Sequence, residues 1–172
     1  VTCLCFAGKD TLAIADSAGR TLLWKISDAS GIGRTLPATA GVIGSLCRIS
    51  SNVIAGLSLD GKLLFWDVTS GELLRFIDCP GPDAAAVLPK LNYWKAQNAL
   101  VWPALDGNLA SCLLDDLKTD EHPAHRHRFS AIMVDGDGLI TIGPYDRTVL
   151  RWHDVDQNTT LCAVSPEGII DA

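Results

Sequence analysis

The chain repeats one pattern of short apolar strands and tight turns four times along its 172 residues. The clearest copy spans residues 52–76, NVIAGLSLDGKLLFWDVTSGELLRF, where two apolar runs flank Asp60-Gly61 and the second run ends at Trp66-Asp67. Asp-Gly between alternating apolar runs predicts a hairpin, because both residues tolerate the positive φ that a tight turn needs. Successive hairpins of this kind predict an antiparallel sheet.

The other copies keep the spacing of the clearest one. An interval of six residues from the turn aspartate to a strand residue occurs three times: Asp60 to Trp66, Asp106 to Cys112 and Asp146 to Trp152. In the first copy Trp24 holds the strand position, and the nearest turn aspartate, Asp16, lies two residues early. Aliphatic residues stand twelve positions before the strand residue in each copy: Leu12, Ile54, Leu100 and Ile140. Chance would rarely supply such a column.

A further strand is expected before each hairpin. Nineteen residues before the tryptophan lie Cys5, Cys47 and Met133 in the first, second and fourth copies, and KLNYWKAQN lengthens the third copy. The repeats are therefore 42, 46 and 40 residues long. Four short strands per repeat, with almost no helical periodicity, are typical of β-propeller blades and not of a helical solenoid.

The repeats resemble the WD-repeat family, because Trp66-Asp67 is a WD dipeptide and DRTVLRWHD matches the signature of the third strand. This resemblance implies an all-β fold, a β-propeller of four-stranded antiparallel blades. About four blades are expected, at residues 1–40, 41–80, 81–126 and 127–167, with 168–172 beginning a further blade. We expect these blades to be part of a larger propeller of seven or eight blades, or half of an assembly that another chain completes; a closed four-bladed ring is the alternative.

In the family, a Gly-His pair opens each repeat, and its histidine joins a buried network with a Ser or Thr, the turn aspartate and the tryptophan. Glycines stand at that place here, at Gly41, Gly81 and Gly168, but other residues replace the histidine. The resemblance implies that His127 takes the role in the fourth blade, with Asp146 and Trp152, and that Ser58, Asp60 and Trp66 form a partial network. The expected structural signature is Trp24, Asp60, Trp66, Asp67, Asp106, His127, Asp146 and Trp152.

Charge and hydropathy limit the partners and the compartment. Lys and Arg total 14 against 20 Asp and Glu, a net charge of −6, which is the wrong sign for binding nucleic acid through phosphates. No apolar stretch is long enough for a membrane-spanning helix. The six cysteines lack the Cys-x-x-Cys spacing of metal sites and are predicted to be buried thiols in a reducing compartment. An intracellular location, cytoplasmic or nuclear, follows as an expectation.

Two segments carry candidate binding residues. EHPAHRHRF places His122, His125 and His127 beside Arg126 and Arg128, a group that could hold zinc or an anion, or form a solvated loop. Without accompanying cysteines or a second ligand pair, the solvated loop is favoured.

The second segment is the insertion of the third repeat, where Tyr93 and Trp94 could anchor a partner or form a satellite apolar cluster on that blade. A catalytic pair at His153 and Asp154 is not expected, since adjacent strand residues point apart.

Catalytic motifs are not found in the sequence, which contains no G-x-S-x-G elbow, phosphate-binding glycine loop or H-E-x-x-H. The prediction is a non-catalytic scaffold without cofactor that binds other proteins within a multi-subunit complex, through the turns at Asp60, Asp106 and Asp146 and the loop at 122–128. The alternatives are a propeller that binds a small ligand, anion or metal through the His/Arg loop, or a sensor module attached to a catalytic domain.

Overall fold

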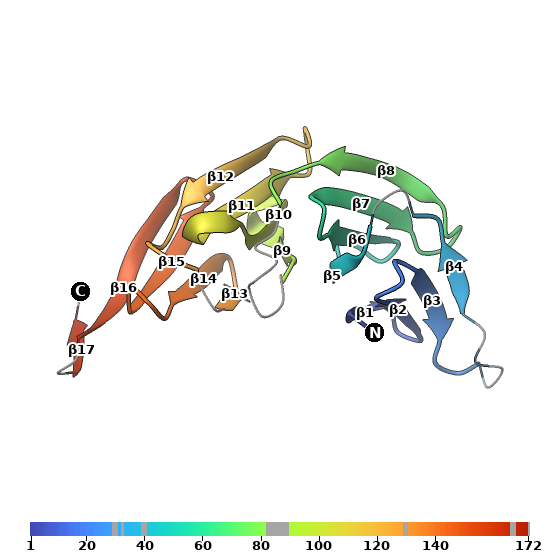
Figure 1. Ribbon diagram of the computed structural model, residues 1–172, viewed down its shortest axis with the longest axis horizontal. Helices are drawn as coiled ribbons and strands as arrows, with labels where there is room; N and C mark the ends of the chain where they lie inside the picture. Colours follow the sequence, from blue (N-terminus) through green and yellow to red (C-terminus); the bar gives the residue numbers. More distant parts are fainter. Residues whose placement is uncertain are drawn as a thin grey trace. The chain divides into compact units, whose positions relative to one another are not determined.

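The computed structural model describes residues 1–28, 31, 33–38, 41–81, 90–128, 131–165 and 168–171, with the backbone alone beyond residue 161. These residues form four antiparallel sheets (Figure 1), in which strands adjacent in the chain are hydrogen-bonded neighbours. The chain divides into two compact units, Val1–Pro82 and Asp83–Ala172. The expected all-β fold of four-stranded antiparallel blades is confirmed.

The first unit contains two four-stranded sheets. The strands of the first are β1 (Cys3–Gly8), β2 (Thr11–Ala15), β3 (Thr21–Lys25) and β4 (Arg34–Leu36). Those of the second are β5 (Ile43–Arg48), β6 (Val53–Ser58), β7 (Lys62–Asp67) and β8 (Leu73–Asp78). The hairpin between β6 and β7 turns at Gly61, whose φ of 80° is left-handed, as the Asp-Gly pair predicts.

The second unit contains one sheet of four strands and one of five. The strands of the first are β9 (Asn92–Trp94), β10 (Ala99–Pro103), β11 (Asn108–Leu113) and β12 (Thr119–Pro123), with the 3₁₀ turns η1 (Lys95–Gln97) and η2 (Leu105–Gly107) between them. The last sheet is made of β13 (Ala131–Asp135), β14 (Gly138–Gly143), β15 (Thr148–Asp154), β16 (Gln157–Ser165) and β17 (Gly168–Asp171). Among the described residues, the two helical segments are single 3₁₀ turns, and neither could cross a bilayer.

The core of the first unit lies between its two sheets, where β1 and β2 pack beside β5. Small side chains of the first sheet meet large ones of the second; the buried residues are Ala7, Ala13, Ala15, Leu23, Leu36, Ile43, Leu46, Ile54, Leu64 and Trp66. The indole of Trp66 is fully buried, and its Nε1 donates a 2.7 Å hydrogen bond to the carbonyl oxygen of Pro37. Burial of aliphatic and aromatic area is the main stabilising term of such a core.

The core of the second unit is built in the same way. Its buried residues come from both sheets: Trp94, Val101, Leu109, Ile132, Leu139, Leu150 and Trp152. Trp94 donates from Nε1 to the carbonyl oxygen of Asp137, 2.8 Å away, and thereby ties β9 to the turn between β13 and β14.

Strand pairing departs from the predicted column in the last sheet. Ile140 is expected to hold the place of Leu12 and Ile54, which pair with Trp24 and Trp66, but Leu139 is the residue that pairs with Trp152. The connection from β14 to β15 spans residues 144–147, one residue more than residues 59–61 between β6 and β7. One extra turn residue shifts the pairing by one and turns Ile140 to the opposite face.

The last described segment also differs from its expected place. Residues 168–172 were expected to open a further blade, yet β17 pairs with β16 as the fifth strand of the last sheet.

The prediction of buried thiols is wrong for most of the cysteines whose side chains are described. Cys112 is buried, whereas Cys3, Cys5, Cys47 and Cys79 are partly exposed, and Cys162 lies outside the described side chains. All five are thiols. Burial raises the pKa of Cys112 to about 11, so this thiol stays protonated and unreactive near neutral pH.

Candidate functional site

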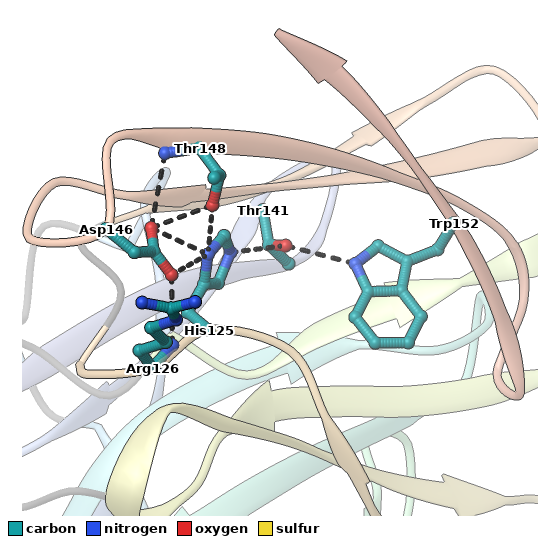
Figure 2. A network of polar contacts seen from close by, with 6 residues as sticks. All are labelled: His125, Arg126, Thr141, Asp146, Thr148 and Trp152. Atoms are coloured by element: carbon teal, nitrogen blue, oxygen red, sulfur yellow. Dashed lines mark hydrogen bonds and ion pairs between the residues drawn. The ribbon is translucent and has the colours of Figure 1, made fainter. Parts of the chain in front are cut away.

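The connection that follows β12 carries a buried polar network into the last sheet (Figure 2). His125 lies in this connection, Thr141 on β14, Trp152 on β15, and Asp146 with Thr148 at the turn that joins these two strands. The His125 side chain is fully buried. A buried polar side chain must find hydrogen-bond partners, and each of these residues supplies one.

The imidazole of His125 bridges two sides of the network. Its Nδ1 lies 3.1 Å from Asp146 Oδ2 and 2.9 Å from Thr148 Oγ1, while its Nε2 lies 2.9 Å from Thr141 Oγ1. Trp152 Nε1 donates to the same Thr141 oxygen at 3.0 Å. The chain of contacts therefore runs from the turn aspartate through the imidazole and hydroxyl to the indole.

The contacts decide where the protons lie. The Asp146 carboxylate only accepts, so His125 Nδ1, which faces it, carries the hydrogen of the neutral imidazole. Nε2 then accepts from the Thr141 hydroxyl, whose oxygen in turn accepts from Trp152 Nε1. Burial lowers the pKa of His125 despite the opposing charge of Asp146, which agrees with a neutral ring.

Asp146 is held as a carboxylate. Burial opposes its charge, but hydrogen bonds from the Thr148 hydroxyl and the Arg126 N–H outweigh that effect and lower the pKa of Asp146. The Thr148 hydroxyl donates to Asp146 Oδ1 at 2.7 Å, and the Arg126 N–H donates to Oδ2 at 3.0 Å. The aspartate therefore fixes both the tight turn and the loop beside it.

Two glycines let the backbone approach this network. A Cβ on Gly143 would meet Asp146 Oδ1 and His125 Nδ1 well inside contact distance. Gly107 has a φ of 82°, and a Cβ there would collide with the carbonyl oxygens of His125 and His127. The Gly107 carbonyl also accepts from the His125 N–H at 3.0 Å, which anchors the loop to η2.

The expectation that His127 is the network histidine is wrong. His125 takes that place, whereas His127 is exposed and sets its ring edge-on to Tyr145, with centroids 6.1 Å apart. The connection between β12 and β13 has no strand periodicity to fix its register, so a shift of two residues leaves no trace in the repeat spacing. Asp146 and Trp152 do lie in the network, as expected, and Thr141 and Thr148 complete it.

The same network supports a surface hollow of about 370 Å³. Six residues line it: Leu105, Asp106, Arg126, His127, Arg128 and Tyr145. Tyr145 is 72% exposed and Leu105 is 54% exposed, so the hollow offers apolar contact area to a partner. Arg126 and Tyr145 also border a second hollow, of about 660 Å³, beside Asp146 and Thr148. We refer to the six residues of the first hollow as the Tyr145 surface.

The other candidate residues of the basic loop divide between this surface and the interior. Arg126 and Arg128 are exposed on the Tyr145 surface. His122 is buried on β12, with Nε2 2.9 Å from Ser111 Oγ and Nδ1 3.3 Å from Asp156 Oδ1. Within the part of the chain that the structure describes, no three His, Cys, Asp or Glu side chains are grouped to hold a metal ion. His122, His125 and His127 are therefore not grouped as a ligand set in this structure.

Tyr93 and Trp94 belong to β9 and not to an extended loop. Trp94 is fully buried in the core, so it cannot anchor a partner. Tyr93 is half-buried, and its hydroxyl donates to Asn98 Oδ1 at 3.0 Å. A strand of three residues is too short to show alternation in the sequence. The one sequence signal that favoured a packed strand over a loop was the apolar Leu91 just before β9.

The turn residues of the first unit act locally. The Ser58 hydroxyl and the Gly41 N–H help to lower the pKa of Asp60, but the expected partial network stops there, because Trp66 donates to Pro37 instead. Asp67 accepts from the N–H groups of Thr69 and Ser70 at 2.8 and 2.6 Å and so closes the turn after β7.

Comparison with known proteins identifies the fold. No family model matches the chain, and no curated protein matches it. Solved structures do match: that of U3-55K with a TM-score of 0.72 and 17% identity, and that of the RRP9 WD40 repeats with 0.70 and 18%. The C-terminal WD40 domain of Sif2 matches with a TM-score of 0.69 and 16% identity.

The extent of these matches is uneven between the chains. They cover 99%, 99% and 91% of this chain but 53%, 52% and 44% of the solved chains, so this chain spans about half of their length. At such identity the likeness concerns the fold, and four antiparallel sheets with a Trp-Thr-His-Asp network agree with it. The chain has the fold of WD40-repeat β-propellers.

Proposed function

We propose that the chain is a non-catalytic protein-interaction module and that the Tyr145 surface is where its partner binds. The observation that carries the proposal is an exposed aromatic ring and an exposed leucine beside two arginines, on a loop that a buried network holds in place. Tyr and Arg are the residues that most often dominate binding energy at protein interfaces. The propeller fold itself supports a scaffold role in general.

The charge of the surface indicates the kind of partner. Arg126, His127 and Arg128 form a local basic group on a chain whose net charge is −6. Asp106 is the one carboxylate among the six lining residues, and Asp146 accepts hydrogen bonds from Arg126 N–H and the Thr148 hydroxyl. We infer that the partner presents an acidic segment with an aromatic or aliphatic side chain that fills the hollow beside Tyr145.

Preorganisation supports binding at this place. Asp146 fixes the backbone of Arg126, and Gly107 and Thr141 fix His125. The loop therefore has little conformational entropy left to lose when a partner binds. This surface also accounts for the basic loop better than metal binding does, since two of its three histidines are buried in contacts of their own. We propose that the role is assembly within a complex of proteins.

The proposal is tested by comparing the proteins captured on the wild-type chain and on a Tyr145→Ala, Arg128→Glu variant. A matched control is Phe76→Ala, Arg75→Glu, which also replaces an aromatic residue and an arginine, at exposed positions of β8. We expect one or more partners to be lost from the first variant and kept by the control, and their affinity for the purified chain to fall as salt rises. Equal capture by all three chains would overturn the proposal.

A further inference from the structure

One face of the first sheet is apolar and uncovered. Side chains alternate along a strand, and the residues that share the side of Trp24 are Leu4, Phe6, Leu12, Ile14, Leu22 and Trp24, here named the Trp24 face. Leu4 is 57% exposed and Phe6 is 60% exposed, and the other four are half-buried. A contiguous apolar face of this kind marks a site of protein association.

The second sheet shows what the equivalent face does when it is covered. Four positions of the Trp24 face recur 42 residues later, where all are buried: Leu46, Ile54, Leu64 and Trp66 in place of Leu4, Leu12, Leu22 and Trp24. Trp66 also finds a main-chain acceptor, the Pro37 carbonyl, in the segment that follows the first sheet. The equivalent Trp24 Nε1 is shielded from solvent yet has no hydrogen-bond partner.

The surface that covers the second sheet indicates what kind of partner would cover the Trp24 face. That surface is the other face of the first sheet, which presents Ala13, Ala15, Thr21 and Leu23, all buried. The occupant is therefore a β-sheet that presents a mainly aliphatic face.

The last sheet of the same chain carries a mainly aliphatic, partly exposed face at the positions that correspond to this cover. Ala131, Met133, Ile140, Ile142, Val149 and Arg151 share one side of β13, β14 and β15; we name it the Met133 face. The last four correspond through strand pairing to Ala13, Ala15, Thr21 and Leu23, but they are half-buried where those are buried. Met133 is 49% exposed, and Arg151 Nε is screened from solvent without a partner.

We propose that two copies of the chain associate head to tail, with the Met133 face of each copy on the Trp24 face of the other. Such a contact joins two different surfaces, and a dimer closes when both copies use both surfaces. It covers the two apolar faces. This association does not depend on the Tyr145 surface and goes beyond the proposed function.

The packing inside the first unit predicts which side chains meet across the new contact. Cys5 on β1 packs against the core of this unit, and β1 lies against β5, whose last residue is Arg48. Met133 holds the place of Cys5, since each pairs through its sheet with the residue before the tryptophan. Phe6 stands 42 residues before Arg48. Met133 of one copy is therefore expected to meet Phe6 of the other.

Sedimentation velocity on the 172-residue chain tests the proposal, with near-UV circular dichroism to confirm folding of each variant. The wild-type chain is expected to have twice its mass of 18.4 kDa. F6K and M133E each place an unpaired charge in the contact and should weaken the dimer about 30-fold or more. Both positions are exposed within a single copy, so both variants should fold.

A charge-reversal pair makes the test specific. The double variant F6K/M133E brings Lys and Glu together across the contact and should restore the dimer, whereas L74E, on an exposed position of β8, should leave it unchanged. A wild-type monomer would overturn the proposal. So would larger species that grow with concentration, single variants that dimerise like the wild type, or a double variant as weak as the single ones.

Discussion

His125 and Asp146 lie 21 positions apart in the chain, yet Nδ1 of one is 3.1 Å from Oδ2 of the other. This contact joins the irregular connection after β12 to the tight turn between β14 and β15. It thereby places the exposed residues on both sides of it, Arg126 and Tyr145, at the rim of one hollow. The binding surface proposed above depends on a buried pair that no partner touches.

Replacement of His125 by alanine is expected to destabilise the chain by about 3 kcal/mol, because it leaves Asp146 and Thr141 buried without their partner and opens a cavity. His127→Ala is the matched control and should change the free energy of unfolding by less than about 0.5 kcal/mol, since His127 is exposed. Urea denaturation followed by tryptophan fluorescence measures both. Equal losses would contradict the assignment of His125 to the network.

Stability is expected to fall as the pH drops below neutrality. The pKa of His125 is lower in the folded chain than in the unfolded one, so the unfolded state takes up a proton first as the pH passes about 6.5, the ordinary histidine value. The lowered pKa of Asp146 adds a second loss at more acidic pH, where the unfolded chain protonates before the folded one. Both contributions are fully present at pH 7 and above.

Thermal unfolding of the wild type and of His125→Gln, from pH 5 to pH 8, measures the first of these losses. The glutamine can hydrogen-bond but does not titrate, so its melting temperature should depend less on pH between 7 and 5.5 than that of the wild type. The same dependence in both chains would show that the titration of another group is responsible.

The sheets could be predicted from the sequence because turn chemistry and strand alternation are local. The Asp60-Gly61 turn and the six-residue step to Trp66 determine which residues pair across β6 and β7, and the structure has that pairing. The same logic failed by one residue at Ile140, since the longer turn at 144–147 changes the pairing without changing the spacing from Asp146 to Trp152.

The histidine of the network could not be assigned from spacing. His125 and His127 are chemically identical candidates two residues apart, and the choice between them is made by Gly107, whose carbonyl accepts the His125 N–H. This hydrogen bond joins the connection after β12 to η2, and the repeat spacing does not indicate that these two segments meet. The burial of Trp94 was also hidden, because this residue packs on the last sheet and donates to Asp137 in the turn between β13 and β14.

Gly143→Ala is expected to destabilise the chain by about 2 to 4 kcal/mol, since its Cβ would overlap both Asp146 and His125 in a packed interior. Gly81→Ala is a suitable control, because a Cβ at Gly81 meets no atom within 4 Å. Denaturant unfolding of both variants measures the difference. A Gly143 variant as stable as the control would mean that the network is not packed as described.

Thr141 is expected to be the residue through which His125 and Trp152 are coupled, since its hydroxyl contacts both. Thr141→Val keeps the shape of the side chain but leaves the Trp152 N–H without its acceptor and His125 Nε2 without its donor, at a cost of about 2 to 4 kcal/mol. Trp152→Phe removes the N–H itself. If the hydroxyl joins the two groups, the double variant should lose less than the sum of the single losses, by about 1 kcal/mol, because Thr141→Val no longer strands an indole donor. A double-mutant cycle by urea denaturation measures this coupling, and strictly additive losses would show that Trp152 does not take part in the network.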